Sequence, residues 1–442
     1  MRSTMENHIN YIFETSSIYK DKSKEEVEAS LYQTIIDALH ENYGSSPDSA
    51  LDKRIQQEWH RLEEMDAVLD VVALYEITKW MRENGYAYWA TLGGGSFIFY
   101  LLKIINANPL PPHYLCPKCK SIVWKHEYKD GFDLPRNGEK CAVCSKKMIR
   151  AGHDIPWQMY LGFKDYFNAE LRVDSSLENV LPKYFESHWL ISLRPETTYS
   201  QPYPKYEALH RFGELTFITS IDENEISPTY HENNVDPYNH DEAFENWEAL
   251  VGAPIDLLDE MIAPEEFSDI VALSGLMHST SAWDEDTEYM VSHLGYLYSD
   301  LICHSDDVYY YLLSHGFTEK DAWRGAEAAR KNIELPVITA EMRNAKDKWV
   351  LARLEQIKYL FPKAHSLEHI YFCIKAKRYV TIESTEERDE RYLHHGRLLE
   401  DLIPEIRDMD DDVFKCFVKT ALNNPDVKSI IEADNPRYFT SE

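Results

Sequence analysis

The chain has 442 residues, of which 44% are hydrophobic and 13% aromatic. This length allows two or three domains with buried cores, and the composition excludes a disordered protein. There are 46 basic and 76 acidic residues, a formal net charge of −30, and this acidity opposes a general affinity for nucleic acid. No apolar run approaches the roughly 20 residues that span a bilayer, and no signal-peptide pattern opens the chain, so we expect no membrane association and a cytoplasmic protein.

The N-terminal part of the sequence is predicted to be helical. Ser23 and Glu26 have the spacing of a capping box, which predicts the start of a helix that ends at the Gly- and Pro-containing stretch 44–47. A second helical pattern runs over residues 51–83 and stops at Asn84-Gly85. These helices precede an aromatic, Gly-rich stretch that we expect to contain a tight turn.

The remaining sequence alternates between segments of different composition. A Cys- and Pro-rich segment is followed by strand-like runs such as residues 215–221, and then by a long helical pattern with an acidic end. No internal repeat is present. The patterns predict five regions: an N-terminal helical region at 1–107, a four-cysteine module at 108–164, a mixed segment at 165–240, a helical domain at 241–380 and an acidic helical extension at 381–442.

Four cysteines form two CxxC pairs, Cys116 with Cys119 and Cys141 with Cys144, separated by 21 residues. Two such pairs can complete a tetrahedron of thiolates around zinc and leave no open coordination position, which predicts a structural Zn²⁺ site. The alternative, four free core cysteines, is less common at this spacing. The isolated cysteines fit buried core positions: Cys303, Cys373 and Cys416.

The residues around these cysteines carry a more specific pattern. NPLPPHYLCPKC at 108–119, GFDLP at 131–135 and GHDIPWQMYLGFK at 152–164 resemble, in order and spacing, the zinc-containing segment of the PolC-type alpha subunit of DNA polymerase III. FSDIVALSGLMHSTSAW at 267–283 and IKYLFPKAH at 357–365 are similar to the fingers segments of the same family.

The resemblance covers residues 51–379, with AEMR at 340–343 preceding the last block. It implies an α+β fold with a reduced polymerase-beta-like palm, a four-cysteine zinc module and a mainly helical fingers-like half. The N-terminal region and the segment 165–240 would then be palm-like, and the domain 241–380 fingers-like. The chain has no room for the other modules of the family.

The resemblance also identifies positions where catalytic carboxylates are expected. The family places an Asp-x-Asp motif shortly after the GFK found here at 162–164, and the same count reaches Glu170 and Arg172. A slipped register would bring in Asp174, and the nearest candidate for a third carboxylate is Asp222. Two-metal polymerisation needs carboxylates, so Mg²⁺ would be a cofactor only if polymerase activity is retained.

The turn that would bind the triphosphate is also altered, whereas the fingers-like blocks keep their residues. The family carries an Arg on a Gly-rich turn that cradles the triphosphate, whereas the turn here, at 93–95, lies in a stretch from 83 to 100 without Lys or Arg. In the fingers-like blocks, His278 matches a position near the incoming nucleotide, and three further candidates for nucleotide contact lie in the block 357–365: Lys358, Lys363 and His365. Either packing or nucleotide contact explains their retention.

These observations favour an inactive pseudo-polymerase related to DNA replication, encoded by a phage or another mobile element, that acts by binding a replisome protein. One alternative is a functional or split DNA-directed DNA polymerase piece that needs another chain for its carboxylates. A second alternative is a zinc-stapled DNA-binding module, which the net charge of −30 disfavours.

Overall fold

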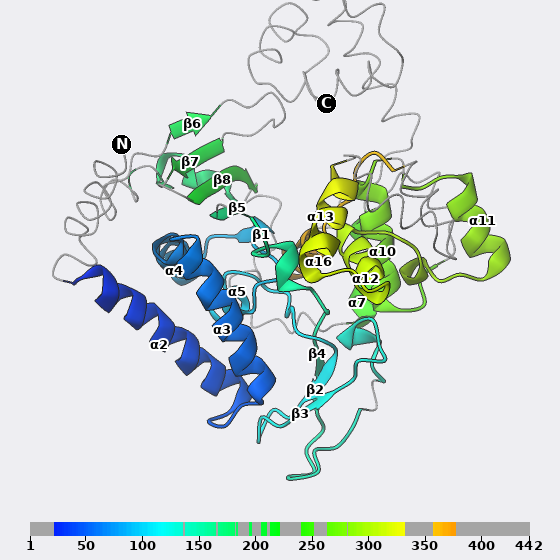
Figure 1. Cartoon of the computed structure of the whole chain (residues 1–442), viewed down its shortest axis with the longest axis horizontal. Helices are drawn as coiled ribbons and strands as arrows, with labels where there is room; N and C mark the ends of the chain where they lie inside the picture. The colour runs from blue at the N-terminus through cyan, green and yellow to red at the C-terminus, as the bar shows by residue number, and fades with distance from the viewer. Residues whose placement is uncertain are drawn as a thin grey trace, which may run out of the picture.

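The computed structural model describes residues 22–135, 138–164, 167–181, 183, 194–196, 205–209, 213–221, 240–251, 263–280, 282–331 and 357–376. Within these residues the fold mixes helices with two small sheets (Figure 1). The expected acidic extension 381–442, the block 340–343, Asp222 and Cys416 lie outside the described residues.

The first helix begins and ends where the sequence predicts. Helix α2 spans Lys24–Tyr43, and the reciprocal hydrogen bonds of the Ser23–Glu26 capping box open it. Gly44, with φ of 87°, ends it in a conformation that favours glycine. Its buried residues, among them Leu31 and Ile35, form one face.

The single helix predicted at 51–83 is wrong, because two helices occupy this stretch. Helix α3 spans Ser49–Glu64 and helix α4 spans Val68–Glu83. Asp66 between them has φ of 53° and interrupts the helical backbone without a Gly or Pro to signal it. The short α5, Phe97–Leu101, follows the Gly-rich turn.

The larger sheet has five strands in the order β1-β5-β8-β7-β6: Tyr88–Leu92, Phe167–Asp174, Gly213–Ile221, Lys205–Leu209 and Arg194–Glu196. Strand β8 contains the predicted strand at 215–221. Strands β5 and β8 are parallel, and the other neighbours are antiparallel. On β5, Leu171 and Val173 belong to the core that α2, α3 and α4 help to form, so Glu170 and Arg172 project from the opposite face.

The smaller sheet belongs to the four-cysteine module and lies at the end of the molecule away from β6, β7 and β8 (Figure 1). Its antiparallel strands are β2 (His113–Leu115), β3 (Ile122–Trp124) and β4 (Ile149–Ala151), in the order β3-β2-β4. Three 3₁₀ turns flank the two sheets: η1 at Gly131–Asp133, η2 at Trp157–Met159 and η3 at Ser175–Asn179.

The C-terminal described part is a second, helical half with its own core. Its elements are α7 (His240–Glu245), α8 (Trp247–Val251), α10 (Phe267–His278), α11 (Glu285–Leu294), η6 (Tyr298–Asp300), α12 (Ser305–Ser314), α13 (Glu319–Arg330) and α16 (Lys363–Ala376). Trp89 of β1 packs into this core against the Phe372 ring of α16. No helix among the described residues is long and apolar enough to cross a membrane.

Buried polar contacts fix the four-cysteine module to the helical half. The Asp133 carboxylate accepts hydrogen bonds from the backbone amides of Phe267 and Ser268, at 2.7 and 3.2 Å, where α10 begins. The fully buried His153 ring lies between the Asp130 carboxylate and the Tyr371 hydroxyl, at 2.7 Å from each. Hydrogen bonds therefore join the module to both α10 and α16.

Candidate metal centre and cleft

The four predicted zinc ligands converge on one point. Sulfur–sulfur distances are 3.4 Å for Cys116–Cys119, 3.3 Å for Cys119–Cys141, 3.1 Å for Cys119–Cys144 and 3.5 Å for Cys116–Cys144. Tetrahedral Zn²⁺ with Zn–S bonds of about 2.3 Å needs sulfurs about 3.8 Å apart, so a small expansion would admit the ion. Four soft donors and no open position fit a structural zinc.

The two CxxC pairs are equivalent in backbone geometry. The Lys120 amide donates to the Cys116 carbonyl at 3.0 Å, and the Ser145 amide donates to the Cys141 carbonyl at 2.8 Å. Lys120 and Ser145 have φ of 60° and 58°, so each pair ends on a left-handed residue. This repetition turns both pairs of sulfurs toward the same centre.

Hydrogen bonds favour the thiolate at one of these ligands. The Ser121 hydroxyl lies 3.3 Å from the Cys141 sulfur, and this contact, followed by the backbone amide of Cys144, lowers the pKa of Cys141 to about 6. A thiolate is the form that binds metal. The pKa of Cys119 is raised, because its hydrogen bonds to the other three sulfurs favour the protonated thiol.

The sequence-predicted carboxylate site lies on β5 and faces the helical half. The Thr91 hydroxyl of β1 donates to the Glu170 carboxylate, and the Arg172 guanidinium carbon lies 5.7 Å from the centre of the Trp89 ring. Asp174 does not join them, because its carboxylate accepts from the Ser176 amide at 2.9 Å and caps η3.

These residues do not fit Mg²⁺. In the described part of the chain, the four cysteines form the one group of three or more His, Cys, Asp or Glu side chains able to share an ion. Arg172 puts a cation on the strand face that holds Glu170. The backbone register of β8 places Thr216 opposite Glu170 and Ile218 opposite Arg172, and neither residue is a carboxylate.

The predicted Gly-rich turn is present, but the amides that follow it are already used. Gly93 and Gly95 have φ of 136° and 97°. The fully buried Glu58 carboxylate of α3 accepts from the Phe97 and Ile98 amides at 2.9 and 3.1 Å. The hydroxyl of Ser96, the N-cap of α5, also donates to it at 2.7 Å. A carboxylate from within the chain thus occupies the start of α5.

A cavity of about 390 Å³ lies beside this turn, between the larger sheet and the helical half, and Gly93, Gly94 and Asn168 line one side of it. The cavity is also lined by three cations: Lys164, Arg330 and Lys331. Of these, Lys164 ends the GFK block, whereas the other two belong to α13 and its C-terminal cap, outside every block of the resemblance.

Ion pairs neutralise part of this charge. Arg330 makes two 2.9 Å contacts with Glu327, and Lys331 lies 3.4 Å from the same carboxylate. Burial lowers the pKa of Lys164, whose ammonium lies 5.6 Å from the centre of the Tyr160 ring. Asp306 and Glu327 also line the cleft, so its charge is mixed.

Three of the predicted nucleotide contacts are not brought together in this cleft. His278 stacks on Phe361, with ring centres 5.1 Å apart, and its Nδ1 lies 2.8 Å from the Ser274 carbonyl. Lys358 is exposed, and its amide donates to the Thr280 carbonyl at 2.9 Å. Lys363 lines a smaller cavity of about 200 Å³. From the same block, His365 does line the larger cleft.

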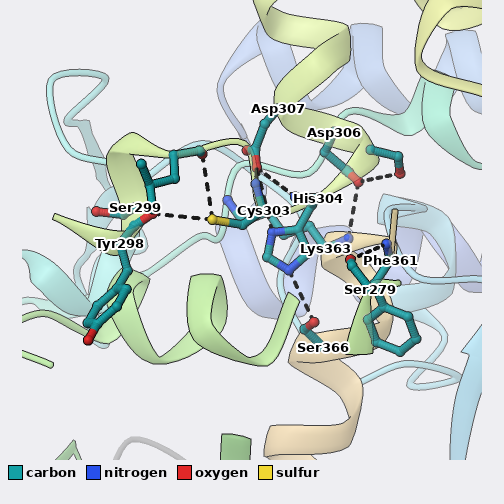
Figure 2. A network of polar contacts seen from close by, with 12 residues as sticks. Ser279, Tyr298, Ser299, Cys303, His304, Asp306, Asp307, Phe361, Lys363 and Ser366 are labelled. Atoms are coloured by element: carbon teal, nitrogen blue, oxygen red, sulfur yellow. Dashed lines mark hydrogen bonds and ion pairs between the residues drawn. The ribbon is translucent and has the colours of Figure 1, made fainter. Parts of the chain in front are cut away.

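The smaller cavity adjoins a buried polar network around the start of α12 (Figure 2). The Asp306 carboxylate accepts from the Lys363 amide at 3.1 Å, and the His304 Nε2 lies 3.1 Å from the Ser366 hydroxyl. Asp307 accepts from the His304 amide at 2.8 Å. These contacts hold the start of α16 against α12.

No family model matches the sequence. The chain is similar to several proteins described as "DNA polymerase III PolC-type". The protein of Thermotoga petrophila is 24% identical over 76% of this chain and 32% of its own length. That of Listeria welshimeri is 22% identical over 77% and 31%, and that of Ureaplasma parvum 23% identical over 75% and 31%. The chain spans about a third of the length of these relatives, and it is a distant homologue of PolC-type DNA polymerase III.

Proposed function

We propose that the chain is a PolC-like protein of DNA replication that has lost polymerase chemistry and acts by binding another protein of the replisome. The observation that carries this proposal is Arg172 beside Glu170 on one face of β5. The resemblance places the two metal-binding aspartates of the family at these positions, in a sheet that we take as a remnant of the palm.

The chemistry of phosphoryl transfer explains why this change is decisive. Two metal ions stabilise the attacking and leaving oxygens, and several carboxylates must hold them. Glu170 retains one carboxylate, which hydrogen-bonds to Thr91, whereas Arg172 adds a positive charge that repels a divalent cation. The residues paired with them on β8, Thr216 and Ile218, supply no replacement.

The Gly-rich turn supports the same conclusion. A phosphate bound at the start of a helix uses free backbone amides, but Glu58 takes the amides of Phe97 and Ile98. Removing Glu58 from them would cost this buried carboxylate two hydrogen bonds and would leave it those from Arg54 and Ser96. The turn therefore lacks both the family Arg and these free donors.

The cleft supports the alternative of a split polymerase piece, because Lys164, Arg330 and the glycine turn line one cavity. Such a piece would need carboxylates from another chain on the face where Arg172 packs against Trp89. The pseudo-polymerase requires no such rearrangement, and we favour it for that reason.

A protein partner fits the charge of the chain better than DNA does. The formal net charge is −30, and duplex DNA would meet long-range repulsion that a basic or neutral protein surface would not. The origin in a phage or another mobile element remains part of this proposal.

The test is binding of the purified chain to each purified replisome protein of its source cell, measured by calorimetry beside a primer–template duplex. We expect one protein to bind at least about tenfold more tightly than the duplex, a difference of about 1.4 kcal/mol, and Glu170→Ala to leave that affinity unchanged. Tight binding of the duplex together with no binding of any replisome protein would contradict the proposal.

A further inference from the structure

The four-cysteine module has a local excess of basic over acidic residues, although the chain as a whole is acidic. Residues 108–164 contain ten Lys and Arg and five Asp and Glu, whereas the whole chain has 46 against 76. The module lies at one end of the molecule (Figure 1). It is therefore a basic region that projects from an acidic protein.

Several of these cations surround the metal centre and are open to solvent. Lys118 is exposed in the first CxxC pair, and Lys140, Lys146 and Lys147 are exposed around the second. None of the four forms an ion pair with a carboxylate among the residues that the structure describes. Lys125 and Lys129 differ, because they pair with Glu139 and Asp300.

The arrangement around the second pair places like charges together. Lys140 and Lys147 face each other in an antiparallel bridge, with Lys146 next in the chain. Like charges opposite each other on neighbouring strands are destabilising, so a bound anion would stabilise this arrangement. Val143, 78% exposed, lies between them at the tip of the loop and offers an apolar contact.

The metal accounts for part of the positive surplus. Four thiolates and one Zn²⁺ carry a net charge of −2, which offsets two of the five surplus positive charges in residues 108–164. Lys164 lines the cleft, so two surplus positive charges remain in the module, and they need another explanation.

We propose that the exposed lysines around the second CxxC pair bind the phosphates of single-stranded nucleic acid, with Val143 against a sugar or base. The site is separate from the cleft and does not depend on the proposed loss of catalysis. A single strand suits it, because a flexible strand can meet a small basic tip without bringing a stiff duplex close to the acidic remainder of the chain.

The test is fluorescence anisotropy of a labelled 20-mer of deoxythymidylate with the full, zinc-loaded chain at 50 and 200 mM salt. Each phosphate contact on a single strand contributes a slope of about −0.7 in log K against log salt, so three lysines give about −2. We expect the wild type to bind roughly 16-fold more weakly at the higher salt. The variant Lys140→Gln/Lys146→Gln/Lys147→Gln should lose most of this dependence and at least about tenfold in affinity at 50 mM.

The matched control is Lys53→Gln/Lys103→Gln/Lys320→Gln, which removes the same charge from exposed lysines elsewhere. It should change affinity less than about twofold, since these residues lie outside the site. Zinc content and thermal melting establish that both variants are folded. Absence of binding, an equal loss in the control, tighter binding of duplex, or equal binding of poly-glutamate of matched length would each overturn the proposal.

Discussion

At the scale of single residues, the positions that the resemblance assigns to the polymerase site make contacts within the chain. Glu170 and Arg172 share a strand face, and Arg172 packs on the Trp89 ring. Glu58 fills the start of α5 with a buried carboxylate. Under the proposed function, these internal contacts take the place of the groups that would bind metal and triphosphate.

Two buried residues of the α12 network have opposite effects on stability. Burial raises the pKa of Asp306 from 3.8 to about 6 and lowers that of His304 from 6.5 to about 3. As pH falls below 6.5, the unfolded chain protonates its histidine while folded His304 does not, so stability is lost. As pH falls below 6, folded Asp306 gains a proton before the unfolded chain does, so stability is regained. Between pH 4 and 6 the two effects offset each other.

Asp306→Asn removes the carboxyl whose protonation offsets the pH effect of His304, so the effect of His304 on stability should become measurable. We expect the free energy of unfolding of this variant, relative to wild type, to fall by about 1.4 kcal/mol for each pH unit between pH 6 and 4. Urea denaturation at four pH values in that window measures it, with the exposed Asp286→Asn as control. Parallel pH profiles of the free energy of unfolding for wild type and Asp306→Asn would contradict the raised pKa of Asp306.

At the scale of elements, the features that neighbouring residues determine were predicted correctly. Features without such a local signal were not predicted. The capping box at Ser23 and the strand at 215–221 depend on neighbouring residues, and both are confirmed. The break at Asp66 has no local signal, because Asp there adopts a left-handed backbone instead of Gly.

The same distinction applies to the candidate site. The cysteine spacing predicted a cluster that the structure contains. The contacts of Glu58 with Phe97 and of Asp133 with Phe267 span 39 and 134 residues, and no local pattern encodes such partners. The cations of the cleft at Arg330 and Lys331 were missed for the same reason, since only the folded chain places them near Gly94.

Zinc should stabilise the module and, through Asp133, the start of α10. We expect one zinc per chain in the wild type and well under one in Cys116→Ser/Cys141→Ser, measured by elemental analysis. In the double variant we expect faster amide hydrogen exchange in β2 than in the wild type. Exchange should also be faster at Phe267 and Ser268, whose amides donate to the Asp133 carboxylate. The control Ala142→Ser changes an exposed residue of the second CxxC pair without removing a sulfur. Full zinc content or unchanged exchange in the double variant would contradict this coupling.

At the scale of the whole molecule, an acidic chain includes a four-cysteine module with an excess of basic residues, and it spans about a third of the length of its relatives. Its two halves enclose a cleft lined by both basic and acidic side chains, and Glu170 and Arg172 lie on one face of β5. We take this distribution as support for the proposed role of a protein that contacts replication components without copying DNA.

Primer extension with Mg²⁺ or Mn²⁺ and all four deoxynucleoside triphosphates tests the loss of polymerase chemistry most directly. Missing metal and phosphate contacts each cost several kcal/mol of transition-state stabilisation, hence factors of roughly thousands in rate. The account predicts no extension by the wild type and none by Glu170→Ala. Extension by the wild type that Glu170→Ala abolishes would contradict it, because Glu170 would then be holding a catalytic metal.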